Sequence, residues 1–300
     1  MDLRQLAYFV AVADEANFTR AAAKVHVAQP GVSAQIRRLE RELGQDLFDR
    51  SGRTVRLTEA GAAVLPYARA ALAAVAGAQL AVDELTGLMR GHVTIGTVTS
   101  MSEDIGLPGL LASFHTAHPA VEIGLEVANT NDLIEALHTG RLDMAFVGLG
   151  TTTPLGIETH VVSREPLVAV VSHTDTLAAT TTITLKALAD HALISLPQGT
   201  GLRACLDDAC ATAGFQPHIA FEASDPRVLT QLAAQSLGTA IVPRSVANSH
   251  RKHVHTIAIT RPALRGGLAL AWRTEGPISP AARALIARAR AELGPVTKVV

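Results

Sequence analysis

Apolar residues in the first fifth of the chain recur at helical spacing in two short blocks. The members of each block lie at i, i+3 or i+4 steps and so share one helix face: Phe18, Ala21, Ala22 and Val25 in the first, and Val32, Ile36, Leu39 and Leu43 in the second. Asn17 is a good N-cap for the first block, and Gly44 stands where a helix ends. Two short amphipathic helices joined by a tight turn predict a helix-turn-helix, whose second helix enters the DNA major groove. The outer face of that second helix is expected to show Ser33, Arg37 and Arg41.

The flanking residues complete a small domain. A preceding helix is predicted from Asp2 to Asp14, with an apolar stripe that packs on the next two helices. After Gly44, apolar residues alternate with polar ones on both sides of a turn at Ser51-Gly52, which predicts a short hairpin, or wing. Residues 1–58 are therefore expected to form an N-terminal, mainly all-α winged helix-turn-helix domain.

A single long helix is predicted over residues 59–90, with Thr58 as its N-cap. Its apolar positions follow a strict 4-3 alternation typical of a coiled coil: Val64, Ala68, Ala71, Val75, Ala78, Val82, Leu85 and Met89. An alanine-rich helix also places alanine at any spacing, but most of these positions hold Val, Leu or Met. We therefore expect a linker helix that dimerises the chain. At about 1.5 Å per residue, it would be a rod of about 45 Å.

The hydrophobic period changes after Gly91. Short runs rich in β-branched residues alternate with helical stretches, which predicts a largely parallel α/β sheet: HVTIGTV, VEIGLEV, MAFVGLG, LVAVVS, LISLP, TAIVP and LALAWR. About 210 residues in this pattern suggest two lobes. We expect a two-lobed α/β domain at 91–300, with lobe I at 91–162 and 267–300 and lobe II at 163–266. The crossings are placed near Val162–Arg164 and Arg265–Leu268.

Composition narrows the class of protein without naming a function. Hydrophobic residues make up 48% of the 300 residues, charged residues make up 18%, and the net charge is −1. Residues 1–58 hold nine Lys and Arg against seven Asp and Glu, so an argument for DNA must come from the positions of the arginines. The N-terminus does not resemble a secretory signal, and no run of about 18 apolar residues is present. We expect a soluble cytoplasmic protein with no membrane contact.

Three dense motifs near the N-terminus resemble a known family. LRQLAYFVAVADEANFTRAA, QPGVSAQIRRLERELGQDLFDR and VRLTEAG are similar to the N-terminal domain of LysR-type transcriptional regulators, and the likeness continues more loosely to the C-terminus. The resemblance implies a two-lobed α/β effector domain like a periplasmic binding protein. It also implies a tetramer, in which the long helices make one interface and the effector lobes another.

Side chains at the start of a recognition helix read base edges in the major groove. Gln29, Pro30 and Ser33 occupy that start, and the resemblance supports a base or backbone contact for all three. The chain departs from the family at Ala28, where many relatives have a capping Ser, and at Ala34, where many have a longer polar residue. The phosphate contacts are expected from Thr19, Arg20, Arg37, Arg50 and Arg53. Alternatively, these arginines are solvated or paired with Glu40, Glu42 or Asp49.

A second site is expected in the cleft between the lobes. Ligands of open α/β sheets bind beyond the carboxyl ends of strands, where helix N-termini offer free N–H groups. Four segments fit that geometry: 97–100, 129–131, 149–151, and 199–201 with Arg203. Their hydroxyls and backbone donors suit a small anion such as a carboxylate. The resemblance implies that Ser100, Thr130 and Thr200 line the inducer site. The expected ligand contacts are Thr99, Ser100, Thr130, Thr200, Gly201 and Arg203.

Several other residues could indicate a different function or a local structural feature. Cys205 and Cys210 resemble the peroxide-sensing branch of the family, but the position of its reactive cysteine holds Gly201 here. Five residues along one helix also place the two side chains about 140° apart. A histidine cluster in SHRKHVH has no cysteine or carboxylate to complete a metal site. Asp225 is predicted to be an N-cap, and Ser236 replaces a glycine usual in relatives, which predicts a strained helix end.

The expected function is a ligand-responsive transcriptional regulator with no metal and no cofactor besides its effector. Its partners would be double-stranded promoter DNA, a small-molecule co-inducer and further copies of the chain, with RNA polymerase as an additional candidate. The alternatives are a thiol- or redox-responsive regulator of the same fold and a plain small-molecule-binding protein. An enzyme is not expected, because the chain lacks a GxSxG elbow, a Walker loop, an HExxH motif and a GxGxxG motif.

Overall fold

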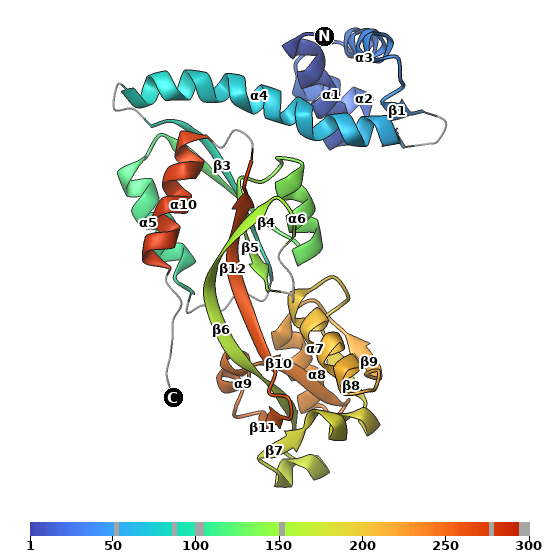
Figure 1. The fold of residues 1–300 in the computed structure, drawn as a ribbon, viewed down its shortest axis with the longest axis vertical. Helices are drawn as coiled ribbons and strands as arrows, with labels where there is room; N and C mark the ends of the chain where they lie inside the picture. Colours follow the sequence, from blue (N-terminus) through green and yellow to red (C-terminus); the bar gives the residue numbers. More distant parts are fainter. Residues whose placement is uncertain (51–53, 86–88, 100–104, 150–153, 276–278, 294–300) are drawn as a thin grey trace.

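The computed structural model describes residues 1–50, 54–85, 89–99, 105–149, 154–275 and 279–293. A helical head lies across one end of a two-lobed α/β body, and a long helix runs between them (Figure 1). The described head comprises α1 (Leu3–Glu15), α2 (Phe18–Lys24), α3 (Gln29–Leu43), β1 (Phe48–Asp49) and β2 (Arg56–Leu57).

The local signals explain the head. The Asn17 side chain accepts hydrogen bonds from the backbone N–H groups of Thr19 and Arg20, which are otherwise free in the first turn of α2. Gly44 ends α3 with φ +71°, a conformation that costs other residues strain. Strands β1 and β2 pair antiparallel, with Phe48 opposite Leu57. The helix-turn-helix and the strands of the wing are therefore confirmed, while the turn of the wing falls outside the described residues.

Helix α4 (Glu59–Leu85) divides the expected apolar seam into two parts. Ala68 is buried against the head, and Val64 and Ala71 pack on the same core. Val75 and Val82, further along, are about half exposed, at 51% and 56%. The first part of the expected seam thus packs on α1 within the same chain, and the second part stays open, while dimerisation itself stays a prediction.

By length and composition alone, residues 59–78 of α4 would be long and apolar enough to cross a membrane. Alanine accounts for much of that hydropathy. In this fold, Leu65 and Ala68 are part of the head's core, and Arg69 of the same stretch pairs with Asp14 of α1. The structure therefore gives this helix a packing role in the head.

One sheet runs through both lobes, in the order β4-β3-β5-β12-β6-β10-β8-β9, with β11 also paired to β6, and β7 to β11. Lobe I holds β3 (Gly91–Thr97), β4 (Val121–Val127), β5 (Met144–Gly148), α5 (Leu107–Ala117), α6 (Thr130–His138) and α10 (Pro280–Glu292). Lobe II holds β7 (Thr182–Thr184), β8 (Leu193–Ser195), β9 (Ile219–Glu222), β10 (Thr239–Pro243), β11 (Val254–Thr260), α7 (Gly201–Thr212), α8 (Pro226–Ala234) and α9 (Arg244–Ser249), together with the 3₁₀ segments η2 (Thr176–Ala179) and η3 (Leu185–Asp190).

Two long antiparallel strands, β6 (Ile157–Ser172) and β12 (Arg265–Arg273), connect the lobes (Figure 1). Their register shifts between Leu268 and Ala269, opposite Ser163 and Val161. The expectation of a largely parallel sheet holds for β3, β4 and β5 and for β8, β9 and β10, but it was wrong for the middle of the sheet. The reason is that a chain that enters lobe II along one strand must return along a strand that runs the opposite way.

Candidate DNA-binding and ligand-binding sites

Helix α3 begins without a side-chain cap. Ala28 is the N-cap residue, and its methyl side chain cannot accept a hydrogen bond from the first turn. Pro30 lies in that first turn, where its missing N–H removes no hydrogen bond of the helix. Gln29 and Pro30 are both exposed. The first turn of α3 therefore presents an amide, an apolar ring and unpaired backbone N–H groups to a molecule that approaches this end of the helix.

Ser33 does not lie on the outer face where the sequence pattern placed it. Its side chain is buried, at 9% exposure. The reason is geometric: Ser33 lies only about 60° around the helix from Ile36, which is fully buried in the head's core. Ser33 therefore belongs to the edge of the apolar face. Its role as a base reader stays a prediction, and burial of the side chain counts against that role.

Arg50 is already engaged within the head. Its Nη2 donates to Oε2 of Glu40 at 2.7 Å, and its guanidinium stacks over the ring of Phe18 at 5.2 Å. Glu40 is buried and also accepts from the backbone N–H of Leu47 at 3.0 Å. This ion pair ties α3 to the strand of the wing. Arg50 thus follows the alternative in which an expected phosphate contact is paired with a carboxylate.

The remaining expected phosphate contacts differ in availability. Thr19 and Arg20 are exposed at the start of α2, where Arg20 also binds Glu15 through its guanidinium. Arg37 is exposed, and its Nε donates to the Ser33 carbonyl at 3.4 Å. Arg53 lies outside the described residues. Arg37 is thus the best placed of these cations on the recognition helix itself.

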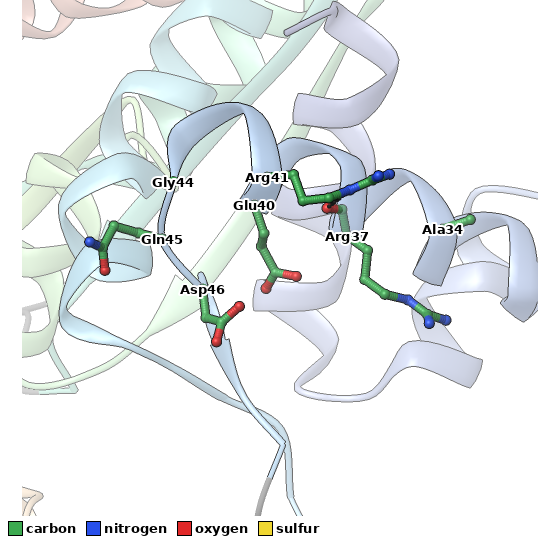
Figure 2. A pocket seen from close by; sticks show the side chains of 7 residues that line it. All are labelled: Ala34, Arg37, Glu40, Arg41, Gly44, Gln45 and Asp46. Atoms are coloured by element: carbon green, nitrogen blue, oxygen red, sulfur yellow. Dashed lines mark hydrogen bonds between the residues drawn. The ribbon is translucent and has the colours of Figure 1, made fainter.

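An open hollow of about 920 Å³ lies beside Arg37, between the C-terminal half of α3 and the segment leading to β1 (Figure 2). Its lining residues include side chains of both charges: Ala34, Arg37, Glu40, Arg41, Gly44, Gln45 and Asp46. Arg41 was expected on the outer face of the helix, whereas Gln45 and Asp46 had no predicted role. The sequence did contain a signal for both residues. They directly follow Gly44, which ends α3, so they begin the segment that leads from α3 to the wing.

The expected inter-lobe segments meet at the end of β5. The Thr130 hydroxyl accepts from the backbone N–H of Gly148 at 3.1 Å. A Cβ placed on Gly201 would lie 2.6 Å from the Gly148 carbonyl carbon, so α7 of lobe II abuts β5 of lobe I. A Cβ on Gly199 would lie 2.9 Å from Nδ2 of Asn131. Two of the four expected segments, 129–131 and 199–201, are thereby adjacent at Gly148, which directly precedes the third segment, although they are far apart in sequence.

Among the expected ligand contacts, Thr99 lies in an exposed position and the hydroxyl of Thr200 already has hydrogen-bond partners. Thr99 is exposed just after β3, and Ser100 and residues 150–151 lie outside the described residues. The Thr200 hydroxyl donates to the Pro197 carbonyl at 2.8 Å and accepts from the Arg203 N–H at 3.4 Å. Thr200 is therefore the N-cap of α7, so a ligand contact through its hydroxyl would compete with these bonds.

Arg203 is not the free cation that its place in the sequence suggested. It is 7% exposed, its Nε donates to both Asp207 carboxylate oxygens at 2.9 and 3.0 Å, and its Nη1 donates to Glu222 at 2.5 Å. Burial lowers the pKa of the guanidinium, but the bonds to Asp207 and Glu222 outweigh it, and the pKa is raised above its ordinary value. Two carboxylates neutralise this arginine, so it joins α7 to β9 instead of awaiting an anion.

The cysteines are poor thiol switches in this structure. Burial raises the pKa of both thiols, that of Cys210 to about 11. Cys205 donates to the Arg265 carbonyl at 3.4 Å. Because the thiolate is the reactive form, both groups are slow to oxidise near neutral pH.

Asp225 accepts from the Arg227 N–H and caps α8, as expected, and Ser236 has φ +60°, the expected strain at that helix end.

Two family models together match most of the chain. The model "Bacterial regulatory helix-turn-helix protein, lysR family" matches residues 3–62, and the model "LysR substrate binding domain" matches residues 86–294. The transcriptional dual regulator GltC of Bacillus subtilis is 33% identical over 286 residues, which cover 95% of this chain and 93% of that protein. The regulator ShiR of Corynebacterium glutamicum is 37% identical over 244 residues, which cover 80% and 82%.

Solved structures show the same architecture over the full length. A full-length OxyR variant from Pseudomonas aeruginosa has a TM-score of 0.76 at 26% identity, covering 97% of this chain and 95% of that chain. Full-length CbnR in complex with its target DNA has a TM-score of 0.62 at 26% identity, covering 97% and 99%. The helical head, the long helix and the two-lobed body therefore occur together in related proteins.

Proposed function

The chain belongs to the LysR family of DNA-binding transcriptional regulators, and we propose that it is a ligand-responsive member that binds a small anion between its lobes. The effector would alter how the heads of an oligomer engage promoter DNA. The observation that carries this proposal is the meeting of two helix N-termini, one from each lobe, at Gly148.

The geometry around Gly148 supports an anion as the ligand. Helix α6 starts at Thr130 in lobe I, and α7 starts at Gly201 in lobe II. Each N-terminus carries unpaired N–H groups and a positive partial charge. Arg203 is neutralised, so backbone dipoles and hydroxyls would supply the attraction. Such a site favours a small carboxylate over a multiply charged anion, which requires full cations to compensate its charge.

A thermal-shift screen of small carboxylates tests the ligand site. We expect at least one to stabilise the protein, and Thr130→Ala to abolish that shift. Thr116→Ala is the matched control, because Thr116 is exposed on α5 and its hydroxyl donates to the Ala112 carbonyl of its own helix. If no carboxylate shifts the transition of a protein that still binds DNA, the anion proposal fails while regulation itself stands.

We further propose that the chain dimerises through α4, as the seam suggests. Val75 and Val82 are exposed, apolar and one heptad apart on the same face. Two such helices would bury these valines together, and the symmetric heads would then read an imperfect palindrome. Contacts between effector lobes would assemble a tetramer. With DNA as its target in a bacterial cell, we place the protein in the cytoplasm, where RNA polymerase would be a further partner.

Sedimentation velocity tests the dimer. Val82→Asp puts a charge into the proposed seam and is expected to shift the smallest stable species from dimer to monomer. Ala76→Asp places the same charge about 120° around the helix, at another exposed position, and is expected to leave the dimer intact. Equal effects of the two substitutions would contradict a seam centred on Val75 and Val82.

Fluorescence anisotropy with genomic fragments tests promoter recognition. We expect the protein to prefer particular fragments over bulk DNA at moderate salt, because Gln29 and Arg37 are exposed on α3 and suit contacts to base edges and phosphates. Equal affinity for all fragments would instead favour a small-molecule-binding protein without sequence-specific DNA recognition.

A further inference from the structure

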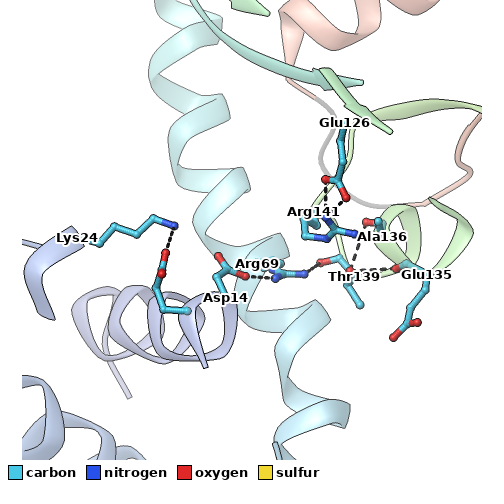
Figure 3. A network of polar contacts seen from close by, with 9 residues as sticks. Asp14, Lys24, Arg69, Glu126, Glu135, Ala136, Thr139 and Arg141 are labelled. Carbon is cyan, nitrogen blue, oxygen red and sulfur yellow. Dashed lines mark hydrogen bonds and ion pairs between the residues drawn. The ribbon is translucent and has the colours of Figure 1, made fainter. Parts of the chain in front are cut away.

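Arg69 of α4 touches both the head and the effector domain. One guanidinium nitrogen donates to the carboxylate of Asp14, near the end of α1 (Figure 3). The other, Nη1, donates to the Thr139 carbonyl at 3.3 Å, at the C-terminal end of α6 in lobe I. The partners lie 55 residues before Arg69 in one direction and 70 residues beyond it in the other. One side chain therefore joins three separate parts of the fold.

This contact differs from an ordinary surface ion pair, which water and salt screen so strongly that it adds little stability. The Arg69 side chain is only 11% exposed, so water screens it weakly. Its second partner is the last carbonyl region of a helix, where the dipole favours a cation. Thr139 is the C-cap residue of α6, so its carbonyl has no N–H partner within the helix and can accept from Arg69.

The α6 end of the contact is itself anchored in lobe I. Arg141, just after α6, pairs with Glu126 of β4 (Figure 3), and Asp143 accepts from the Thr94 N–H of β3 at 2.8 Å. A bond to Thr139 is consequently a bond to the body of lobe I. Lobe II connects to lobe I through β6 and β12, and neither Asp14 nor Thr139, the two partners of Arg69, belongs to lobe II.

We propose that Arg69 is a positioning residue that locks each DNA-binding head to lobe I of its own chain, so that head and lobe I move as one body. Rotation of lobe II can then move a head only through contacts that lobe II makes with other copies of the chain. Without the lock, the head turns on α4, and the spacing of two heads is no longer set by the effector domains. This inference rests on the family's DNA binding and not on the proposed anion.

Distance measurements by double electron–electron resonance test the lock in the full chain. Spin labels are placed at the exposed positions Ala23 of α2 and Ala112 of α5, each replaced by Cys. Cys205 is replaced by Ser, the buried Cys210 is retained, and labelled protein is diluted with unlabelled chain so that only distances within one chain are read. The labelled protein with Arg69 and Asp14 unchanged is expected to show one narrow distribution of distances between the two labels.

Arg69→Gln and Asp14→Asn each remove the charge pairing and are expected to widen that distribution at least twofold. Arg288→Gln is the matched control, because it removes an i,i+4 ion pair with Glu292 within α10 alone. If Arg69→Gln does not fold, Asp14→Asn still decides the question. A distribution as narrow as that of the parent in the folded variants overturns the lock.

A second readout separates positioning from mere packing. On a DNA fragment with two half-sites, obtained by selection with the parent protein, both variants are expected to bind at least fivefold more weakly. On a single half-site their affinity is expected to stay within twofold of the parent, because α3 is untouched. Widened distances with unchanged two-site affinity would overturn the positioning role. Failure of the carboxylate screen would leave both outcomes unaffected.

Discussion

The DNA-binding head and the inter-lobe site present their candidate contacts in different ways. In the head, exposed side chains such as Gln29 and Arg37 project from one continuous helix. Between the lobes, the contacts are largely backbone: Gly201 of α7 abuts Gly148 of β5, 53 positions earlier in the chain. A side-chain substitution can therefore tune the head without moving its backbone, whereas any side chain added at Gly201 forces the lobes apart.

The two regions share one feature, which is that a buried or half-buried arginine serves the fold. Arg50 pairs with the buried Glu40 in the head, and Arg203 pairs with Asp207 and Glu222 in lobe II. Each had been expected to bind an anion from outside the protein. A charged group in a partly desolvated place needs a partner, and a carboxylate of the same fold is always present, whereas the ligand is not.

Removing the partner of Arg50 should have the largest effect. Glu40→Ala deletes a charge-assisted hydrogen bond and leaves the Leu47 N–H without its acceptor, so we expect the head to lose about 3 kcal/mol of stability. Hydrogen exchange of the α3 amides measures this loss. Glu40→Gln keeps an acceptor for Leu47 and should lose about half as much. Unchanged protection in Glu40→Ala would mean that the pair is not part of the head's stability.

A methyl group at the inter-lobe contact should have the next largest effect. Gly201→Ala places a Cβ 2.6 Å from the Gly148 carbonyl carbon, so backbone must shift, at a cost of about 2 kcal/mol in thermal unfolding. Gly109→Ala in α5 meets nothing within 4 Å and is expected to stabilise the protein by about 0.5–1 kcal/mol. Similar values for both variants would show that the lobes do not touch at Gly201.

Within the head, two substitutions on α3 should separate affinity from specificity. Arg37→Ala is expected to weaken binding to all sequences about tenfold and to reduce the slope of log affinity against log salt by about one. Gln29→Ala should leave the slope unchanged and relax preference at one base pair, by about 1–3 kcal/mol. Anisotropy titrations over a salt series measure both. An unchanged slope for Arg37→Ala would remove Arg37 from the phosphate contacts.

The smallest effect is expected from oxidation. Because burial raises the pKa of Cys210 to about 11, its thiolate is scarce near neutral pH and forms only as the pH rises toward that value. Hydrogen peroxide should therefore leave DNA affinity unchanged, and iodoacetamide should label Cys210 only after unfolding, as read by mass spectrometry. A peroxide-dependent change in affinity that Cys205→Ser abolishes would restore the redox-responsive alternative.

Much of the head could be predicted because its signals are local. The spacing of Phe18 and Val25, the cap at Asn17 and the glycine at 44 all act within a few residues, and the structure agrees with each. The inter-lobe site was predictable only as a set of strand ends, since the pattern of parallel strands implies a common edge. The crossings expected near Val162–Arg164 and Arg265–Leu268 fall within β6 and β12, but the sequence pattern did not predict that β6 is one continuous strand from Ile157 to Ser172.

By itself, the amino-acid sequence determined the helix-turn-helix, the long linker helix and the α/β character of the remainder, because periodicity and capping depend on neighbours along the chain. Only the tertiary structure decided which polar groups are available. It buried Ser33 beside Ile36, paired Arg50 and Arg203 with carboxylates, covered the first half of the α4 seam with α1, and placed Arg69 between Asp14 and Thr139. These outcomes depend on residues brought together from distant parts of the chain, which no local pattern records.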